Sequence, residues 1–374
     1  MNILFLGDIM PGGVLPYQDK YIDDDLLLYM RSFDLRVGTL ECGVGTDISF
    51  DKVKMARTMG IVYVRNEDLF RLKEMGINVV TLANNHTFDL GLEGMENAQR
   101  QLDAMGIKYC GAGHNIEEAK KPAVVDFDGR TIAFIGCMID VPSPVMFHKA
   151  TNTDYGVYQL GIDRLEKHIT EVKQQYDYVF VMPHWGEEHS YYPPAYCKEC
   201  AKRMINAGAD GIIGSHPHIV NPVSSYKGKP IYYSLGNFLF PDKCMKVPRP
   251  MYYPATREEC KSLKRVWTYP YRIKENVIAV WHGQNRIGMM AELRLSRKKV
   301  LHRERLTYLT ADNVLYQYWS NLFLCRFKII GEVMKLPKYG FVRRCSLSRF
   351  NLLGRAMNKL STFNIPVQAE QYHI

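Results

Sequence analysis

The sequence has no run of roughly 20 uncharged apolar residues, which is the length that an α-helix needs to cross a bilayer. It also shows no secretion signal, because the apolar run at residues 3–6 is short and no basic segment precedes it. We therefore expect the protein to stay in the cytoplasm, or to be held at the inner face of the membrane as a peripheral protein.

Three binding signatures are missing as well. Gly12-Gly13 is not followed by the Lys-Ser/Thr pair of a phosphate-binding loop. The sequence contains no second Cys-x-x-Cys pair beside Cys197-x-x-Cys200, so a zinc site is not predicted. The nine cysteines are scattered and odd in number, so free thiols are predicted instead of a disulfide framework. No fold signature of specific nucleic-acid binding accompanies the basic residues.

Charge is present but unevenly placed. Residues 243–374 hold 25 Lys and Arg against 8 Asp and Glu, whereas residues 1–242 hold 23 against 31. Such asymmetry predicts either an acidic partner, which would be an anionic polymer, anionic lipid or nucleic acid, or a basic face that only contacts solvent.

Short apolar runs alternate with amphipathic segments, which is typical of an α/β protein. Segments 66–75 and 91–105 are predicted helices, because Gly76 and Gly106 follow them in the position of a helix C-cap. Strands are predicted at residues 3–6, 35–40, 79–82, 131–135, 178–182, 211–213 and 231–234.

This alternation ends after Phe240. Five prolines lie in residues 241–271, so we predict a long insertion loop there, followed by strands at 277–281 and 289–295. From residue 312 onward apolar residues follow helical spacing. The predicted organisation is one domain at 1–311 and a basic helical appendage at 312–374, available for contact with a membrane or a biosynthetic complex.

Polar residues that can bind metal ions follow several predicted strands. Asp8 follows Gly7 at the end of the first strand, and Glu41 ends the second. Asn84-Asn85-His86 follows the third, with Asp89 placed either to orient His86 or to cap the next helix. Taken alone, Asp8 or Glu41 would be an ordinary turn residue. However, α/β proteins place catalytic and binding residues at these strand ends.

Histidines complete the set. His184 ends a further strand, and His216 and His218 follow another with one residue between them. In an extended segment such a pair points the same way, because side chains repeat every second residue. Asn, His and carboxylate donors suit Mn, Zn, Fe or Co, so the pattern predicts a metal-dependent hydrolase.

The same motifs resemble the CapA family of bacterial capsule and poly-γ-glutamate synthesis proteins, in the calcineurin-like metallophosphoesterase superfamily. The resemblance runs from Ile3 to about Phe240 and is densest in His184-Trp185-Gly186, Gly214-Ser215-His216-Pro217-His218 and Ser234-Leu235-Gly236-Asn237-Phe238. It implies a two-sheet α/β sandwich with helices outside and two divalent metal ions at the strand ends.

Carried over by position, the resemblance assigns one metal ion to Asp8, Glu41 and His218, with Glu41 as the bridging carboxylate. The second ion would be held by Glu41 together with Asn85, His184 and His216. His86 would be the general acid or a donor to the transition state. Asp89 is the second candidate catalytic residue, through its possible orientation of His86. We expect substrate contacts from Asn84, Glu188, Asn237 and Arg249.

The chain departs from the superfamily pattern in three places. Met10 stands where a metal-binding His is usual, which predicts weaker metal binding at Asp8. Thr39 replaces the Asn of the family's Asn-Leu-Glu, and His189 stands where Tyr is frequent, so the support of Glu41 and His184 is expected to differ.

Two functions fit these observations. The first is a two-metal hydrolase, a phosphoesterase or an amide hydrolase, that acts on a phosphorylated substrate or anionic polymer in the synthesis of capsular polysaccharide or poly-γ-glutamate. The second is an assembly protein without catalytic activity that uses the metal cleft to hold an anionic polymer.

Overall fold

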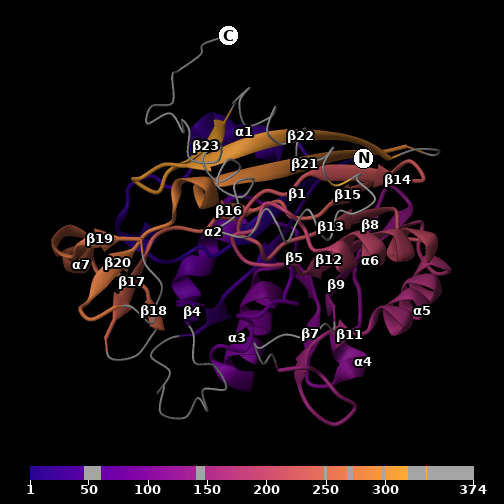
Figure 1. Cartoon of the computed structure of the whole chain (residues 1–374), viewed down its shortest axis with the longest axis horizontal. Helices are drawn as coiled ribbons and strands as arrows, with labels where there is room; N and C mark the ends of the chain where they lie inside the picture. The colour runs from indigo at the N-terminus through magenta and orange to yellow at the C-terminus, as the bar shows by residue number, and fades with distance from the viewer. Residues whose placement is uncertain are drawn as a thin grey trace, which may run out of the picture.

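A computed structural model describes residues 1–45, 60–139, 148–247, 251–267, 273–296, 300–318 and 334. Its core is two large β-sheets packed face to face, with helices on their outer faces (Figure 1). This confirms the predicted α/β two-sheet sandwich. Among the described residues, no helix is long and apolar enough to cross a membrane.

The first sheet has eight strands, with β1 at its centre. Strand β1 pairs in parallel with β2 and β16 and antiparallel with β21. In order across the sheet the strands are β23 (Leu315–Tyr318), β22 (Val300–Leu309), β21 (Ile287–Leu295), β1 (Asn2–Ile9), β2 (Leu35–Leu40), β5 (Val79–Thr81) and β6 (Lys108–Cys110), with β16 (Asn237–Leu239) beside β1.

The second sheet has seven strands. Strand β12 lies in its middle and is buried along its length after Tyr178, which explains its nearly continuous apolar sequence. The order is β11 (Gln159–Leu160), β9 (Arg130–Ile139), β12 (Tyr178–His184), β13 (Gly211–Ile213), β15 (Lys229–Tyr232) and β14 (Val223–Tyr226), with β8 (Ala123–Phe127) beside β9.

Aromatic side chains fill the space between the two sheets. The Phe5 ring of the first sheet lies 6.0 Å from the Phe134 ring and 5.2 Å from the Phe180 ring of the second, measured between centroids. All three side chains are fully buried. This contact fixes the two sheets against each other below the ends of β1 and β12.

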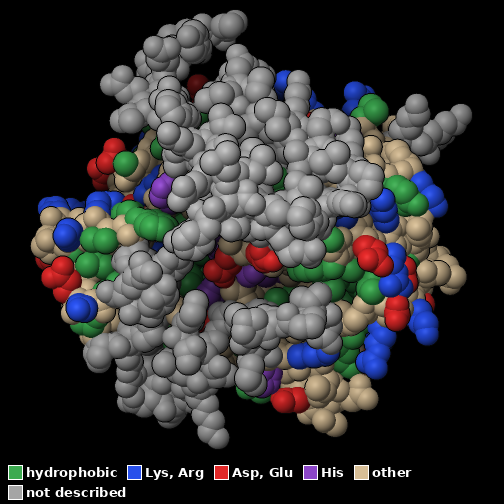
Figure 2. Space-filling model, in the orientation of Figure 1, with side chains coloured by type: hydrophobic (Ala, Val, Ile, Leu, Met, Phe, Trp, Pro, Cys, Tyr) green, Lys and Arg blue, Asp and Glu red, His purple; other side chains and the backbone are tan. Residues whose placement is uncertain are grey.

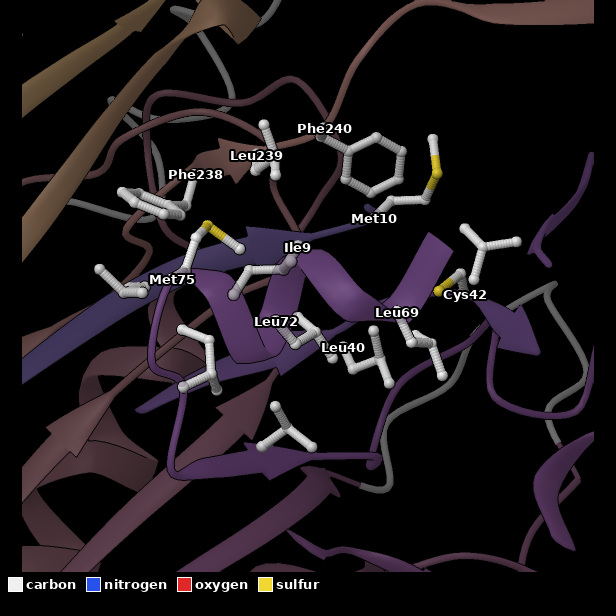
Figure 3. Packing of buried hydrophobic residues seen from close by; sticks show 14 of the residues in the cluster. Ile9, Met10, Leu40, Cys42, Leu69, Leu72, Met75, Phe238, Leu239 and Phe240 are labelled. Carbon is white, nitrogen blue, oxygen red and sulfur yellow. The ribbon is translucent and has the colours of Figure 1, made fainter. Parts of the chain in front are cut away.

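Helices cover the outer faces. The helices on the first sheet are α1 (Asp24–Arg31), α2 (Phe70–Glu74) with the 3-10 turn η2 (Asn66–Leu69), and α3 (Gly91–Met105). Their buried residues pack with those of β1 and β2. Figure 3 shows part of this layer, with Ile9 and Leu40 facing Leu72 and Met75. On the second sheet lie α4 (Ile116–Ala119), α5 (Ile162–Lys173) and α6 (Ala195–Asn206). The short pair β7 (Ala112–Gly113) and β10 (Gly156–Val157) lies beside α4.

The prediction of an irregular loop at 241–271 is wrong. This segment forms β17 (Lys243–Lys246), β18 (Met251–Tyr253), α7 (Arg257–Ser262) and β19 (Arg265–Val266). With β20 (Val277–Ala279), β4 (Ile61–Val64) and β3 (Gly43–Val44), its strands build a third sheet of six strands, at the left of Figure 1. We call it the small sheet. The regular structure of this proline-rich segment depends on backbone pairing of β18 with β4, which lies far away in the sequence.

The prediction of a helix beginning near residue 312 is also wrong at its start. Leu315–Tyr318 form β23, which pairs with β22 at the edge of the first sheet. The Leu315 side chain is fully buried in the core, so this part of the chain is no appendage. Of the following residues only Met334 is described, and it packs against the core of the second sheet. The remainder of the predicted helical stripe lies outside the described residues.

Candidate metal centre

Two carboxylates meet at the centre of the first sheet. Asp8 lies near the end of β1, and Glu41 follows β2, where its backbone N–H donates to the Ile9 carbonyl at 2.9 Å. Both side chains are completely buried. Asp8 Oδ1 and both Glu41 side-chain oxygens accept no hydrogen bond from any described donor. Buried carboxylate oxygens are normally satisfied, so these three are candidate ligands for a cation.

The chain can pass this closely only because of Gly7. The carbonyl oxygen of Gly236 lies 1.9 Å from the point that a Gly7 Cβ would occupy. The parallel pairing of β1 with β16 brings the same carbonyl to the Asp8 N–H, at 2.9 Å. A side chain at residue 7 would push these strands apart and displace Asp8.

Two histidines that follow strands of the second sheet and Asn85, from the turn after β5 of the first sheet, converge beside Glu41. His184 Nε2, at the end of β12, lies 2.6 Å from Asn85 Oδ1, 3.1 Å from His216 Nδ1 and 3.5 Å from Glu41 Oε1. Glu41, His184 and His216 thus offer ligand atoms close enough to share one metal ion, and the Asn85 oxygen faces the same point. We call these four residues the Asn85 set.

A second group lies on the other side of Glu41. His218 Nδ1 lies 3.6 Å from Asp8 Oδ2, and its Nε2 lies 3.6 Å from Glu41 Oε1. Asp8, Glu41 and His218 can also share one ion, and we call them the Asp8 set. Glu41 belongs to both sets, so its carboxylate is placed to bridge two ions. Mixed imidazole, amide and carboxylate donors fit Mn, Zn, Fe or Co.

The position two residues after Asp8 contributes no donor to the Asp8 set. Met10 is buried in the apolar layer over the first sheet, beside Phe240 (Figure 3). A thioether is a soft ligand that these metal ions do not prefer. The Asp8 set therefore has three protein ligands where the Asn85 set has four.

A second layer of hydrogen bonds orients the ligands. Thr39 donates to the Ser215 hydroxyl at 3.2 Å, and that hydroxyl lies 2.9 Å from His184 Nδ1, which directs His184 Nε2 toward Glu41. His218 Nδ1 lies 2.8 Å from Asn237 Oδ1. Asn237 in turn donates to the Asn285 carbonyl at 2.9 Å. Thr39 and Ser215 thus provide the support for His184 that the sequence left in question.

Sequence reasoning missed Ser215 and Asn285. Ser215 precedes the candidate ligand His216 in the motif Gly214-Ser215-His216-Pro217-His218, so its place in that motif could have predicted its role. Asn285 lies in the 3-10 turn η4 (Gly283–Arg286), far along the chain, where it donates to the His218 carbonyl at 3.0 Å. Nothing in the local sequence marks it.

His86 and Asp89 form a buried dyad beside the Asn85 set. Asp89 Oδ2 lies 2.5 Å from His86 Nδ1 and also accepts the backbone N–H of Val62 at 2.7 Å. Asp89 does not cap α3, whose N-cap is Leu90 with no side-chain hydrogen bond. Of the two roles that the sequence left open, Asp89 therefore takes the orientation of His86.

Burial shifts the pKa values of the ligands toward their neutral forms. It raises the pKa of Asp8, against the hydrogen bond from the His216 backbone N–H. Burial also raises the pKa of Glu41 well above its usual range; the charges of Asp8 and Glu188 add to this, and Lys243 opposes it. The pKa of His218 is lowered by burial and by His189 and His216. A cation at the centre would oppose the shifts of the two carboxylates and add to that of His218, because it favours charged carboxylates and neutral imidazoles.

The structure corrects the prediction for the histidine pair and shows what Asn84 and Asn237 contact. His216 and His218 are not in an extended segment, because both have positive φ, 97° and 54°, and their rings join different sets. Asn84 donates to the Leu40 carbonyl and accepts the His86 N–H, at 2.8 and 2.9 Å. The Asn84 amide thus holds the turn, and the Asn237 amide holds His218; their contact with a substrate stays a prediction.

The other two predicted substrate contacts stand differently. Glu188 is exposed on the turn after His184, close enough to influence Glu41 electrostatically. Arg249 lies outside the described residues. In the space-filling view, acidic and histidine side chains gather in a hollow near the middle of the face (Figure 2).

Comparisons with known proteins fit this geometry. The model of the family "Bacterial capsule synthesis protein PGA_cap" matches residues 2–242. The PGA biosynthesis protein CapA of Bacillus subtilis is 33% identical over 250 residues, covering 64% of this chain and 63% of that protein. The capsule biosynthesis protein CapA of Bacillus anthracis is 30% identical over 249 residues, covering 64% and 60%. The chain thus spans less than two thirds of the length of these curated relatives.

Two solved structures are more distantly similar. A putative 5'-nucleotidase from Staphylococcus aureus has a TM-score of 0.44 at 12% identity, covering 89% of this chain and 59% of that one. The NAD nucleotidase of Haemophilus influenzae has a TM-score of 0.41 at 14% identity, covering 91% and 56%.

Proposed function

The chain belongs to the bacterial capsule synthesis protein family PGA_cap, and from that membership we propose that it is a metal-dependent phosphoesterase acting in the biosynthesis of a capsular polysaccharide or poly-γ-glutamate. The observation that carries this proposal is the pair of ligand sets that share Glu41, with the His86–Asp89 dyad beside them. Its substrate would be a phosphorylated compound or an anionic polymer.

The ligands and the dyad have separate tasks. Asp8, Glu41, Asn85, His184, His216 and His218 would hold two divalent ions, which when bound supply Lewis acidity and lower the pKa of water. His86 would donate a proton to the oxygen that leaves phosphorus as water attacks from the opposite side. Because Asp89 occupies His86 Nδ1, the Nε2 atom carries that proton, and the Asp89 carboxylate stabilises the imidazolium.

Hydrolysis of an aryl phosphate by the purified protein with Mn²⁺ tests the proposal. We expect His86→Ala to keep its bound metal and to lose about 10²- to 10⁴-fold in rate, the usual contribution of general acid catalysis. Asp89→Asn should lower the rate in the same direction but have little further effect in the His86→Ala background, because the two residues act as one unit. His114→Ala is the control, since His114 is an exposed histidine paired with Glu96 and Glu118.

A role in assembly without catalysis is the second candidate, and Met10 favours it. An Asp8 set that lacks one ligand could serve to hold a carboxylate-rich polymer without breaking a bond. Tight Mn²⁺ binding by the wild-type protein, with no turnover of phosphate or amide substrates, would decide for this candidate.

The basic residues at 243–374 support an anionic partner for either function. Charge attraction of this kind falls with salt, because ions screen it over about a Debye length. We expect co-sedimentation of the protein with anionic vesicles or poly-γ-glutamate to decline steeply as salt rises. Binding that is unaffected by salt would argue for a basic face that only contacts solvent.

A further inference from the structure

Phe88 is an aromatic residue that reaches solvent where its neighbours are buried. It lies in the segment 82–90 between β5 and α3, which also carries Asn85, His86 and Asp89. Of these nine residues, all of which the structure describes, Phe88 alone is partly exposed. Its Cα lies at most about 7.6 Å from that of His86, because only one residue separates them. An apolar ring is thus open to solvent next to the buried dyad.

Two further rings extend this surface. The centroid of the Phe88 ring lies 5.3 Å from that of Tyr155 and 5.7 Å from that of His148. Tyr155 and His148 stack on each other at 4.0 Å, with 12° between their planes. Both are partly exposed as well. We call Phe88, His148 and Tyr155 the aromatic patch.

The backbone fixes the two rings beyond Phe88. The Val157 N–H donates to the His148 carbonyl at 2.8 Å, and the Ala150 N–H donates to the Val157 carbonyl at 3.0 Å. A Cβ at Gly156 would lie 2.2 Å from the Ala150 nitrogen, so the chain can double back this tightly only with glycine there. Residues 148 and 155 are therefore held side by side.

The aromatic patch lies beside the Asn85 set. Phe88 packs against Met138 at the end of β9. Met138 is the register partner of His184, across strands that run about 4.8 Å apart. In the first sheet, β2 separates β1 from β5, so Asp8 and Phe88 follow strands on opposite sides of the strand that leads to Glu41. The patch is thus at the His86 end of the metal centre.

Polar groups border the aromatic patch. Residues 151–154, Thr-Asn-Thr-Asp, are all exposed between His148 and Tyr155. The carboxylate of Asp154 lies 3.5 Å from His148 Nε2. A flat apolar surface with hydroxyl, amide and carboxylate groups at its border suits a ring that has an apolar face and hydroxyl groups at its edge. The Asp154 carboxylate would repel a polymer of carboxylates such as poly-γ-glutamate.

We propose that the aromatic patch is the subsite for the leaving group and selects sugar phosphates. This inference rests on the proposed function, because it takes the centre to bind a phosphoester whose leaving oxygen receives a proton from His86. The segment that carries the proton donor would then also carry the ring on which the sugar stacks. Leaving groups without a ring gain nothing from the patch.

Binding to the Mn²⁺-loaded His86→Ala protein tests the inference without turnover. Calorimetry would compare glucose 1-phosphate with glycerol 1-phosphate, which has hydroxyl groups but no ring, and with phenyl phosphate, which has a ring without hydroxyl groups. We expect glucose 1-phosphate to bind most tightly. Adding Phe88→Leu or Tyr155→Leu should weaken its binding about three- to tenfold, the usual contribution of a stacked ring, and leave glycerol 1-phosphate unchanged.

Two further variants sharpen the test. Asp154→Ala should weaken the binding of glucose 1-phosphate but not that of phenyl phosphate, because only the sugar offers hydroxyl groups to the carboxylate. Tyr226→Leu is the matched control, at a partly exposed tyrosine on β14, the opposite edge of the second sheet. It should change none of the three affinities. Phe88→Leu and Tyr155→Leu should keep their bound Mn²⁺, because neither residue is a metal ligand.

The outcomes separate this inference from the proposed function. Unchanged affinity for glucose 1-phosphate in both Phe88→Leu and Tyr155→Leu would overturn the subsite and leave the hydrolase proposal intact. Phenyl phosphate binding as tightly as glucose 1-phosphate would overturn the assignment to sugars, without any need for a patch variant to fold. The expected order of affinities with no turnover of any phosphoester by the wild-type chain would keep the subsite and overturn the hydrolase.

Discussion

His168 is a buried histidine that the fold keeps in its neutral form. It lies on the inner face of α5, and its Nδ1 is 2.7 Å from the Tyr158 hydroxyl. Burial, helped by Lys120, lowers its pKa to about 4. In the unfolded chain His168 has a pKa of about 6.5, so it is protonated below that pH. Protonation therefore favours unfolding. The free energy of unfolding is at its full value above pH 6.5 and falls as the pH drops toward 4.

We expect the free energy of unfolding to drop by about 3 kcal/mol over this interval because of His168 alone. His168→Gln should flatten that part of the profile, measured by urea unfolding at a series of pH values. His114→Gln, at an exposed histidine, should keep the wild-type decline. A decline of equal size in His168→Gln would assign the acid sensitivity to other groups.

Single residues of the centre differ in how far the sequence predicted them. Asp8 and Glu41 follow predicted strands, and parallel neighbours end at one sheet edge, so their proximity could be anticipated. Lys243 could not, because its burial depends on Phe240 and on Trp281, which comes 38 residues later in the chain. A charged residue in a proline-rich basic segment carries no local sign of burial.

At the scale of elements, Asp242 joins the small sheet to the rest of the fold. Its carboxylate accepts from Arg286 in η4, from Arg265 in β19 and from Asn313 before β23, the last at 3.1 Å. Asp242→Asn would leave the buried guanidinium of Arg286 without its counter-charge. We expect a loss of about 3–5 kcal/mol in the free energy of unfolding, measured with urea.

The comparison for this variant is an exposed ion pair. Lys20 and Asp24 lie 2.8 Å apart on the surface at the start of α1. Asp24→Asn should change the free energy of unfolding by less than about 1 kcal/mol. If Asp242→Asn were equally mild, the small sheet would be held by its apolar contacts alone.

The sequence predicted the strands of the two large sheets better than those of the small sheet. Strands such as β1 and β12 are long and buried on both faces, so they appear as continuous apolar runs. Strands β17 and β18 have four and three residues, and β18 pairs with β4, which lies far away in the sequence. Short strands without a periodic pattern are specified by such distant partners, which local sequence does not reveal.

At the scale of the whole molecule, residues 313–318 close the first sheet. The Leu315 N–H donates to the Tyr21 carbonyl at 2.8 Å, and the Leu315 carbonyl accepts the Asp23 N–H at 2.8 Å. A chain cut after Asp312 would lose these contacts and the buried Leu315 side chain. We expect the cut chain to unfold at a lower temperature than the full chain. Removal of a detached appendage would leave the unfolding temperature unchanged.

Point variants separate this effect from the loss of the remaining segment. Leu315→Ala should cost about 2–5 kcal/mol, as for other buried leucines. Leu301→Ala, at an exposed position on β22, should cost much less. A truncated chain with the melting temperature of the full chain would show that β23 adds nothing to stability.

The central place of β1 has a consequence for biosynthesis. Residues 2–9 leave the ribosome before the strands they pair with: the antiparallel partner β21 spans Ile287–Leu295, and His218 comes 210 residues after Asp8. At roughly 5–20 residues per second, the nascent chain spends on the order of 15–60 s without its central strand paired on both sides. During that time the apolar strand is exposed to aggregation, and the two candidate ligand sets are complete only after both sheets have closed.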